Sequence, residues 1–163
     1  MDLKGKKLID LMSLISKKQL SEKEIFNYFL NRSKKYNKLL NSYITICDYQ
    51  AGFPITFKDN FLTKNIRTTA ASMVLKNYIP PYNATVVEKL LSKRFSVLGK
   101  TNMDAWAHGS STETSDFGPS KNPWNTNHLP GGSSGGSAAA TAADLCIGSI
   151  GSETAGSFSQ TAN

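Results

Sequence analysis

Residues Gly131–Ser157 read GGSSGGSAAATAADLCIGSIGSETAGS, and this stretch decides the fold. It starts with a glycine-serine turn, continues through alanines of high helix propensity, and ends with an apolar strand-like segment and a second glycine-serine turn. Glycine and serine contribute little burial and lose much backbone entropy on folding, so two such turns need a functional reason. Three interpretations are open: a flexible linker, a phosphate-binding turn, or an active site built from hydroxyl groups.

The first two interpretations fit this stretch poorly. A flexible linker is disfavoured because helix-forming alanines follow Ser137 and an apolar patch follows them at Leu145, Cys146, Ile147 and Ile150. A phosphate-binding turn would use the N–H groups at a helix N-terminus, which attract anions. Neither a Walker motif nor G-x-G-x-x-G is present, so this interpretation stays a minority hypothesis.

The hydroxyl interpretation has to explain how a serine is activated. Residues 131–135 match the G-x-S-x-G motif of α/β-hydrolases, in which the base histidine follows the serine along the chain. Both histidines, His108 and His128, precede Ser133. An activated serine here therefore needs a base other than histidine.

Lys58 is the candidate base. It follows the apolar, strand-like segment 53–57 and precedes a turn at Asp59 and Asn60, either of which could orient its ammonium. A lysine in this place either extends its amine to water or is desolvated, with a lowered pKa that lets it accept a proton. From the residues alone, the exposed amine is the favoured state.

The rest of the chain predicts alternating helices and strands. We expect a helix over 6–18, a helix from a capping box at Ser21 and Glu24 to about residue 40, a strand over 41–48, a helix beginning at Asn83, and a strand over 95–98. We also expect a turn at 99–102 with Asn102 capping residues 103–106, followed by loops over 109–133. This alternation indicates an α/β fold with a site at the turns beyond the strand ends.

Composition and charge exclude several classes of protein. The 163 residues are 39% hydrophobic and 19% charged, which favours one globular domain, and we expect no membrane span or signal region. Cys47 and Cys146 have no partner motif, which favours a reducing compartment. Residues 1–100 carry 18 of the 19 Lys and Arg. Because aromatic residues are not interleaved with these charges, we expect a solvated surface rather than an RNA-binding one.

Several ordered motifs together resemble the amidase signature family. They are Phe57–Asn60, Gly99–Asp104, Gly131–Ser137 and Gly151–Ser157. Within the family, 109–113 and 120–125 are most similar to the A subunits of aspartyl/glutamyl-tRNA amidotransferases. The resemblance covers nearly the whole chain but only about the first third of a family member. It implies an α/β amidase signature fold, a mixed β-sheet core flanked by helices and incomplete at the C-terminus, with a helical segment over 1–40 and an α/β part over 41–163.

The resemblance also implies a Lys–Ser–Ser triad, which accounts for the missing histidine. Lys58 takes the position of the base, Ser133 that of the middle serine after a cis peptide, and Ser157 that of the nucleophile. A neutral Lys58 would accept a proton from Ser133, which in turn accepts one from Ser157. The oxyanion hole would be formed by the backbone N–H groups of Thr154, Ala155, Gly156 and Ser157.

The activity implied is release of ammonia from glutamine. In the family the partner B subunit uses ATP and Mg²⁺ to activate misacylated Glu-tRNA(Gln) or Asp-tRNA(Asn), and the small C subunit binds both proteins. This chain is expected to hold no cofactor or metal, to meet tRNA mainly through the B subunit, and to be cytoplasmic or in an organellar matrix or stroma. A general small-amide amidase and a non-catalytic interaction module are the alternatives.

The sequence departs from the family pattern at several places. Ala155 stands where the oxyanion loop usually has glycine, residues 158–161 replace Ile-Arg-Gln-Pro, and a helical segment is missing between Asp48 and Gly52. The chain stops six residues after Ser157, before the family's glutamine-specificity residues. We therefore expect the isolated chain to have weak or no glutaminase activity.

Overall fold

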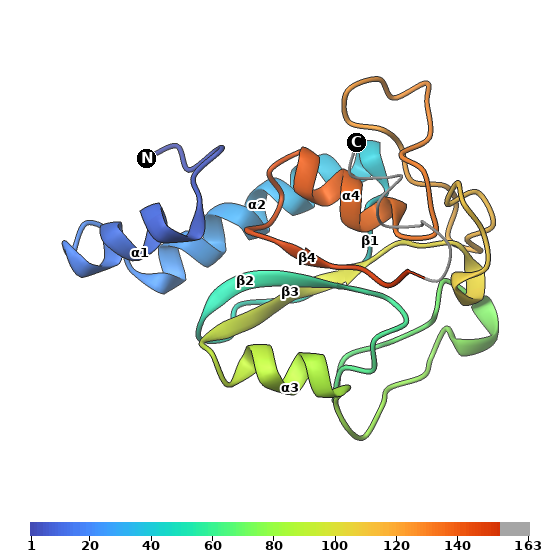
Figure 1. The fold of residues 1–163 in the computed structure, drawn as a ribbon, viewed down its shortest axis with the longest axis horizontal. Coiled ribbons are helices and arrows are strands. Elements are labelled where there is room, and N and C mark those ends of the chain that lie inside the picture. The colour runs from blue at the N-terminus through green and yellow to red at the C-terminus, as the bar shows by residue number, and fades with distance from the viewer. Residues whose placement is uncertain (154–163) are drawn as a thin grey trace.

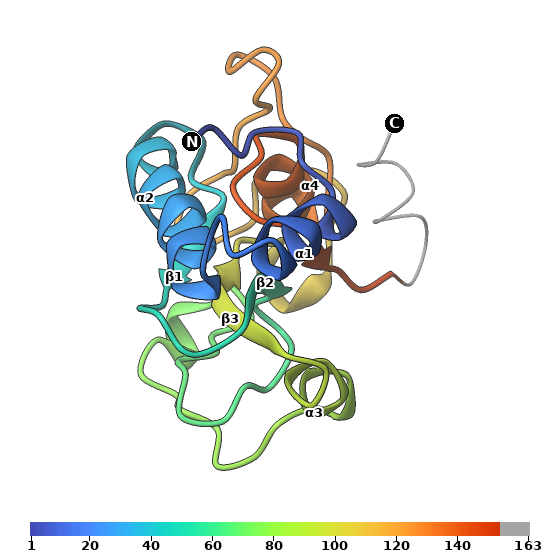
Figure 2. The ribbon, with the colours of Figure 1, turned by 90° about the vertical axis from the view of Figure 1, so that its left-hand side faces the viewer.

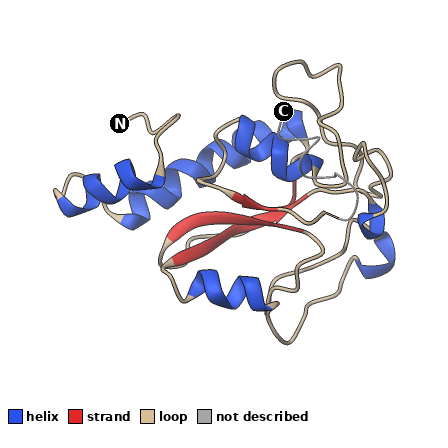
Figure 3. Ribbon diagram, viewed as in Figure 1, coloured by secondary structure: helices blue, strands red, loops and turns tan. Residues whose placement is uncertain are grey.

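The computed structural model of the chain describes residues 1–153. Strands lie in the middle of the molecule with helices on either side (Figure 3). The elements in chain order are α1 (Leu8–Ser16), α2 (Glu22–Leu40), β1 (Tyr43–Ile46), β2 (Phe53–Lys58), the 3₁₀ helix η1 (Met73–Leu75), α3 (Thr85–Leu91), β3 (Phe95–Thr101), the 3₁₀ helix η2 (Ala105–Ala107), α4 (Gly135–Ala142) and β4 (Ser149–Ile150).

The four strands form one mixed sheet in the order β1-β3-β2-β4. β3 pairs antiparallel with β1 and parallel with β2, and β4 pairs parallel with the other edge of β2. The central strands β2 and β3 are buried along nearly their whole length, as expected for parallel strands covered on both faces. The predicted fold class, a mixed α/β sheet flanked by helices, is confirmed.

Helices cover both faces of the sheet. α1, α2 and α4 lie on one side and α3 on the other (Figures 1 and 2). The larger apolar cluster fills the first side and includes Leu11, Phe26, Phe29, Leu98, Ala140 and Leu145. A smaller cluster under α3 contains Ile55, Phe57, Val87 and Val97. Within residues 1–153 the structure has no helix with the length and apolar character needed to cross a bilayer.

The two N-terminal helices form as predicted. In the capping box, the Ser21 hydroxyl accepts the Glu24 N–H at 3.2 Å while the Glu24 carboxylate accepts the Ser21 N–H at 2.8 Å. The apolar face of α1 packs on the core, with Leu11 fully buried and Leu8, Leu14 and Ile15 partly buried against it. These helices therefore cover the sheet and bring no catalytic side chain to its edge.

The predicted turn at 99–102 is wrong, because Gly99, Lys100 and Thr101 continue β3. The glycine is needed for a close approach between strands: a Cβ on Gly99 would lie 2.5 Å from the Thr45 carbonyl oxygen. The register with β2 also shifts at this point, since Ile55 pairs with Val97 and the next residue pairs with Gly99. A glycine inside a strand can mark such an irregularity rather than a turn.

Asn102 joins loops instead of capping a helix. Its amide nitrogen donates to the Asn41 carbonyl at 3.1 Å and the Gly118 carbonyl at 2.9 Å, and its side-chain oxygen accepts the Met103 N–H at 2.9 Å. The short η2 turn that follows has Asp104 at its N-cap position. Asn102 thereby fixes the loop region to the end of β3.

Two other predicted boundaries move. α3 begins at Thr85 with Ala84 as its N-cap, while the Asn83 side chain accepts the Lys64 N–H at 2.7 Å. The apolar patch after α4 gives a strand only at Ser149–Ile150, because Leu145 and Cys146 are buried in the core instead. Both Cys47 and Cys146 are free thiols.

Candidate active site

Lys58 and Ser133 meet at the end of the central strand β2. The Lys58 Nζ donates to the Ser133 Oγ at 2.7 Å and to the Ser152 carbonyl oxygen at 3.1 Å. Lys58 is 0% exposed and Ser133 2% exposed. The exposed amine that the residues alone favoured is therefore wrong, and the desolvated lysine is the one observed.

The sheet and α4 bring these two side chains together. Side chains alternate along a strand, so Phe57 packs toward α3 while Lys58 points toward α4. Thr101, the register partner of Lys58, places its hydroxyl 2.6 Å from that of Ser137 in α4. The helix can come this close because Gly136 has no side chain. A Cβ at this position would lie 2.4 Å from the Asn102 carbonyl oxygen. Small residues at the start of α4 thus bring Ser133 to the sheet.

The environment of Lys58 changes its acid–base behaviour. Burial lowers the pKa of Lys58 from 10.5 to about 8, and the nearby Asp104 carboxylate opposes part of that decrease. An amine with this pKa is partly neutral near physiological pH and can accept a proton from a hydroxyl group. The Ser133 hydroxyl is the group within hydrogen-bonding distance.

Asp59 does not orient Lys58, contrary to one of the sequence-based expectations. Its carboxylate lies 3.5 Å from the Lys100 Nζ and accepts the Thr69 N–H at 2.9 Å. Burial raises the pKa of Asp59 and lowers the pKa of Lys100 to about 8, and each charge opposes the shift of the other. Because Lys100 is the register partner of Phe57, this ion pair belongs to the α3 face of the sheet.

Asn60, the other expected partner of Lys58, acts on the segment after β4. Its amide nitrogen donates to the Ser152 hydroxyl at 3.0 Å. The Ser152 carbonyl accepts from the Ser134 hydroxyl at 3.0 Å in addition to Lys58. Ser152, which follows β4, therefore closes the site. Sequence reasoning could not predict this role, because any residue type supplies a backbone carbonyl.

The carboxylate near Lys58 belongs to Asp104, to which the motifs assign no role. Asp104 is fully buried and accepts the backbone N–H groups of Ser111 at 3.2 Å and Thr112 at 2.9 Å. One signal could have found it, an acidic residue placed shortly after a buried strand and next to the predicted site.

The remaining predicted site residues lie outside the described part of the chain. These are Thr154, Ala155, Gly156 and Ser157, so the nucleophile and the oxyanion hole stay predictions. The peptide between Gly132 and Ser133 is cis, as the family resemblance predicted. The described site thus contains two of the three expected triad positions.

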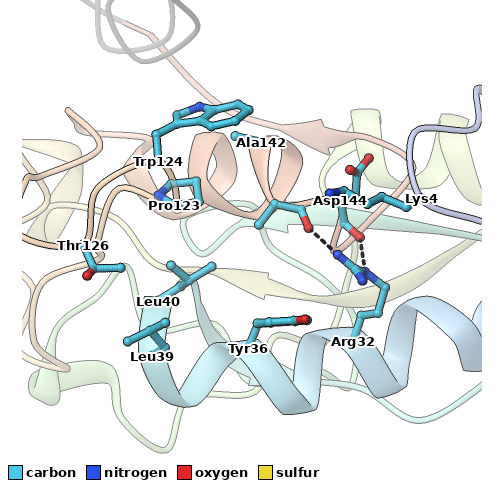
Figure 4. Close-up of a pocket in the computed structure, with 11 residues that line it drawn as sticks. Lys4, Arg32, Tyr36, Leu39, Leu40, Pro123, Trp124, Thr126, Ala142 and Asp144 are labelled. Atoms are coloured by element: carbon cyan, nitrogen blue, oxygen red, sulfur yellow. Dashed lines mark hydrogen bonds between the residues drawn. The ribbon is translucent and has the colours of Figure 1, made fainter.

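A cavity in the described part of the chain lies apart from the Lys58–Ser133 pair. Residues 1–153 contain no group of three or more His, Cys, Asp and Glu side chains arranged to hold a metal. A cavity of about 320 Å³ lies between α2, the end of α4 and the loop carrying Trp124 (Figure 4). Lys58, Ser133 and Asp104 are not among the residues that line it.

A family model and individual relatives of known sequence indicate the same family for this chain. The model of the family described as Amidase matches residues 48–160. The A subunit of glutamyl-tRNA(Gln) amidotransferase from Prochlorococcus marinus is 45% identical over 94% of this chain and 36% of the relative. The same subunit from Thermodesulfovibrio yellowstonii is 44% identical over the whole chain and 38% of the relative. The chain thus spans little more than a third of the length of these relatives.

Solved structures agree with this result. The crystal structure of the A subunit of glutamyl-tRNA(Gln) amidotransferase from Thermotoga maritima is 36% identical with a TM-score of 0.88, over 96% of this chain and 36% of that one. A 6-aminohexanoate cyclic dimer hydrolase is 27% identical with a TM-score of 0.89, over 96% of this chain and 35% of that one. With the matched family model and the Lys58–Ser133 geometry, these similarities show that the chain belongs to the amidase signature family.

Proposed function

We propose that the chain is part of a glutamine amidohydrolase subunit that supplies ammonia for transamidation of misacylated Glu-tRNA(Gln) or Asp-tRNA(Asn). The observation that carries the proposal is the buried Lys58 amine 2.7 Å from the Ser133 hydroxyl. A lysine buried without an ion-pair partner within 4 Å in the described chain costs stability, which is typical of a group kept for its chemistry. The two relatives from Prochlorococcus marinus and Thermodesulfovibrio yellowstonii, both A subunits of glutamyl-tRNA(Gln) amidotransferase, support this choice.

In the proposed mechanism, neutral Lys58 accepts the Ser133 proton while Ser133 takes the proton of Ser157. Ser157 Oγ then bonds to the side-chain amide carbon of glutamine, and the developing oxyanion accepts hydrogen bonds from the N–H groups of residues 154–157. The C–N bond breaks as the amine nitrogen receives a proton back through Ser133, and ammonia leaves. Water, deprotonated along the same relay, hydrolyses the acyl-enzyme to glutamate and frees Ser157.

The rest of the reaction belongs to the proposed partners. The B subunit would use ATP and Mg²⁺ to activate the misacylated tRNA, and the ammonia would complete the amide there, with the C subunit binding both proteins. This chain itself would use no cofactor, since a hydroxyl nucleophile and an amine base suffice for amide hydrolysis. The proposed compartment is the cytoplasm, or an organellar matrix or stroma.

Covalent labelling with a fluorophosphonate probe tests the proposed site. We expect one adduct, mapped by mass spectrometry to Ser157, absent in Ser157→Ala and slowed about 100-fold or more in Ser133→Ala. Ser120→Ala is the matched control, because Ser120 is equally buried but its hydroxyl donates to the Asn41 carbonyl. Absence of labelling, or an adduct that Ser133→Ala leaves unchanged, would favour the non-catalytic module.

A general small-amide amidase is the second candidate, because the similar solved structures include a hydrolase of the 6-aminohexanoate cyclic dimer. Protection from labelling separates the two functions. In the longer subunit of which this chain is proposed to be a part, glutamine should slow labelling of Ser157 at concentrations where propionamide does not. Equal protection by both amides would favour the general amidase.

A further inference from the structure

The carboxylate of Asp104 is buried and saturated with hydrogen bonds from one loop. Its Oδ2 accepts the N–H groups of Ser111 and Thr112 at 3.2 and 2.9 Å. Its Oδ1 accepts from the N–H of Thr114 at 3.3 Å and from its hydroxyl at 2.8 Å. A buried carboxylate is tolerated when donors surround it in this way, and its position is then fixed.

The same carboxylate packs directly against the residue before Ser133. A Cβ on Gly132 would lie 2.2 Å from the Asp104 Oδ2, and a Cβ on Gly109 would lie 2.4 Å from its Cγ. Only residues without a side chain therefore allow the carboxylate to sit between these two segments. The backbone of Gly132 and the backbone of Gly109 therefore fix the position of the Asp104 carboxylate from two sides.

Two further hydrogen bonds tie Asp104 to the turn that carries Ser133. The Asp104 N–H donates to the Ser133 carbonyl at 3.2 Å. Thr112, whose N–H binds the Asp104 carboxylate, donates its hydroxyl to the Gly131 carbonyl at 2.7 Å. Asp104 thus contacts the three residues 131–133 directly or through one neighbour.

We propose that Asp104 is a positioning residue of the amidase site: its contacts fix the turn at residues 131–133, so that the Ser133 hydroxyl stays at Lys58 and the buried carboxylate stays beside that turn. The role rests on the proposed function, because it serves the proton transfer from Ser133. The contacts with residues 131–133 carry the proposal. In agreement with them, the Asp104 carboxylate acts to raise the pKa of Lys58 against the effect of burial.

Within residues 1–153, groups that act on Lys58 come from three segments. They are the Ser133 hydroxyl before α4, the Ser152 carbonyl after β4, and the Asp104 carboxylate after β3. The Asp59–Lys100 pair belongs to the other face of the sheet. Removal of the Asp104 charge should therefore change how Lys58 titrates.

Asp104→Asn tests the proposal, with Asp116→Asn as the matched control. Asp116 also accepts two hydrogen bonds, from the Ser72 hydroxyl and the Met73 N–H, but it is exposed. We expect Asp104→Asn to slow fluorophosphonate labelling about 10- to 100-fold at its alkaline plateau, because the Ser133 hydroxyl is displaced. The acid limb of the pH profile should also move to lower pH, because the Lys58 ammonium loses its facing negative charge. Asp116→Asn should change neither.

If Asp104→Asn lowers the labelling rate at the alkaline plateau but leaves the acid limb of the pH profile in place, Asp104 has a merely structural role and the proposal is overturned. Titration of Lys58 by NMR, in chain carrying ¹³C-labelled lysine, reads the same electrostatic effect without any reaction. A folded Asp104→Asn chain whose Lys58 midpoint equals that of the unsubstituted chain would also overturn it. If the unsubstituted chain is not labelled at all, the proposed function fails while this titration still decides the role of Asp104.

Thr112→Val provides a second test in case Asp104→Asn does not fold. This variant removes the hydroxyl bond to the Gly131 carbonyl and keeps the backbone N–H that binds the carboxylate. We expect labelling about 10-fold slower with the Lys58 midpoint unchanged. Labelling at the unsubstituted rate would contradict the positioning of Ser133 through this loop.

Discussion

Two fully buried lysines lie on neighbouring strands and face opposite sides of the sheet. Lys100 forms an ion pair with Asp59, whereas Lys58 donates to a hydroxyl and a carbonyl. A buried ion pair is typical of a structural role. A buried amine that is hydrogen-bonded only to neutral groups is suited to accept a proton. The two residues therefore have different roles although burial lowers the pKa of both to about 8.

Replacing Lys58 by Met should change how stability depends on pH. The folded-state pKa of Lys58 is about 8 and its ordinary value is 10.5, so between these values the unfolded chain binds one more proton than the folded chain. Unfolding free energy therefore rises with pH in this window, and Lys58 contributes about 2 kcal/mol of that rise from pH 8 to 10. Urea unfolding of both chains should show the unsubstituted chain gaining this amount relative to Lys58→Met. Parallel pH profiles would mean that Lys58 keeps its ordinary pKa.

The residue types and motifs indicate that Lys58 and Ser133 belong to one site, and these two side chains do lie together, but their surroundings were not predictable. The lack of a histidine after Ser133 and the family motifs together led to Lys58 as the base. Its burial could not be predicted, because it depends on how closely α4 approaches the end of β2. The same contact decides that Asp104, and not Asp59, is the carboxylate near Lys58.

At the scale of elements, β3 determines where the site lies. It pairs with both β1 and β2, and its last residues Lys100 and Thr101 lie beside Phe57 and Lys58. The helices and strands with strong periodicity were predicted correctly, including the capped start of α2. The sequence predicts β3 to end too early, because glycine is typical of turns, whereas Gly99 allows β1 to pack closely against β3.

Gly99→Ala should destabilise the chain through this strand contact. The added methyl group would lie 2.5 Å from the Thr45 carbonyl oxygen and 2.9 Å from a Tyr43 ring carbon, so strands would have to separate. We expect a loss of about 1–3 kcal/mol in unfolding free energy. Gly148→Ala is the matched control, because an added Cβ there meets no heavy atom within 4 Å, and it should change stability by less than about 0.5 kcal/mol. Equal effects of the two substitutions would contradict the packing described for β3.

At the scale of the whole molecule, the N-terminal helices are fixed to the segment that carries the site. Arg32 of α2 donates to the Asp144 carbonyl at 3.0 Å and the Ala143 carbonyl at 2.9 Å, just after α4 (Figure 4). The Ser33 hydroxyl donates to the Leu145 carbonyl at 2.9 Å from the same helix. Residues more than 100 positions apart are thus joined, and such contacts follow from tertiary packing that no local pattern predicts.

Arg32→Met should lower the stability of the whole chain. The substitution removes two charge-assisted hydrogen bonds to carbonyls and the contact of the guanidinium with the Tyr36 ring, 5.2 Å from its centroid. We expect a loss of about 1–3 kcal/mol in a single cooperative unfolding transition. Arg94→Met is the control, because the Arg94 side chain is 73% exposed and its bond to Glu22 lies at the surface. If α1 and α2 of Arg32→Met unfold in a separate transition before the rest of the chain, α2 does not link the N-terminal helices to residues 143–145 as described.

The proposed chemistry depends on a desolvated amine at position 58 that can take a proton from Ser133. NMR titration of the Lys58 side chain in the unsubstituted chain, assigned by comparison with Lys58→Met, measures this property. We expect a midpoint near pH 8, because burial lowers the pKa of Lys58 to about this value. A midpoint at the ordinary lysine value of 10.5 would mean an amine in water and would contradict the amidase mechanism proposed for this site.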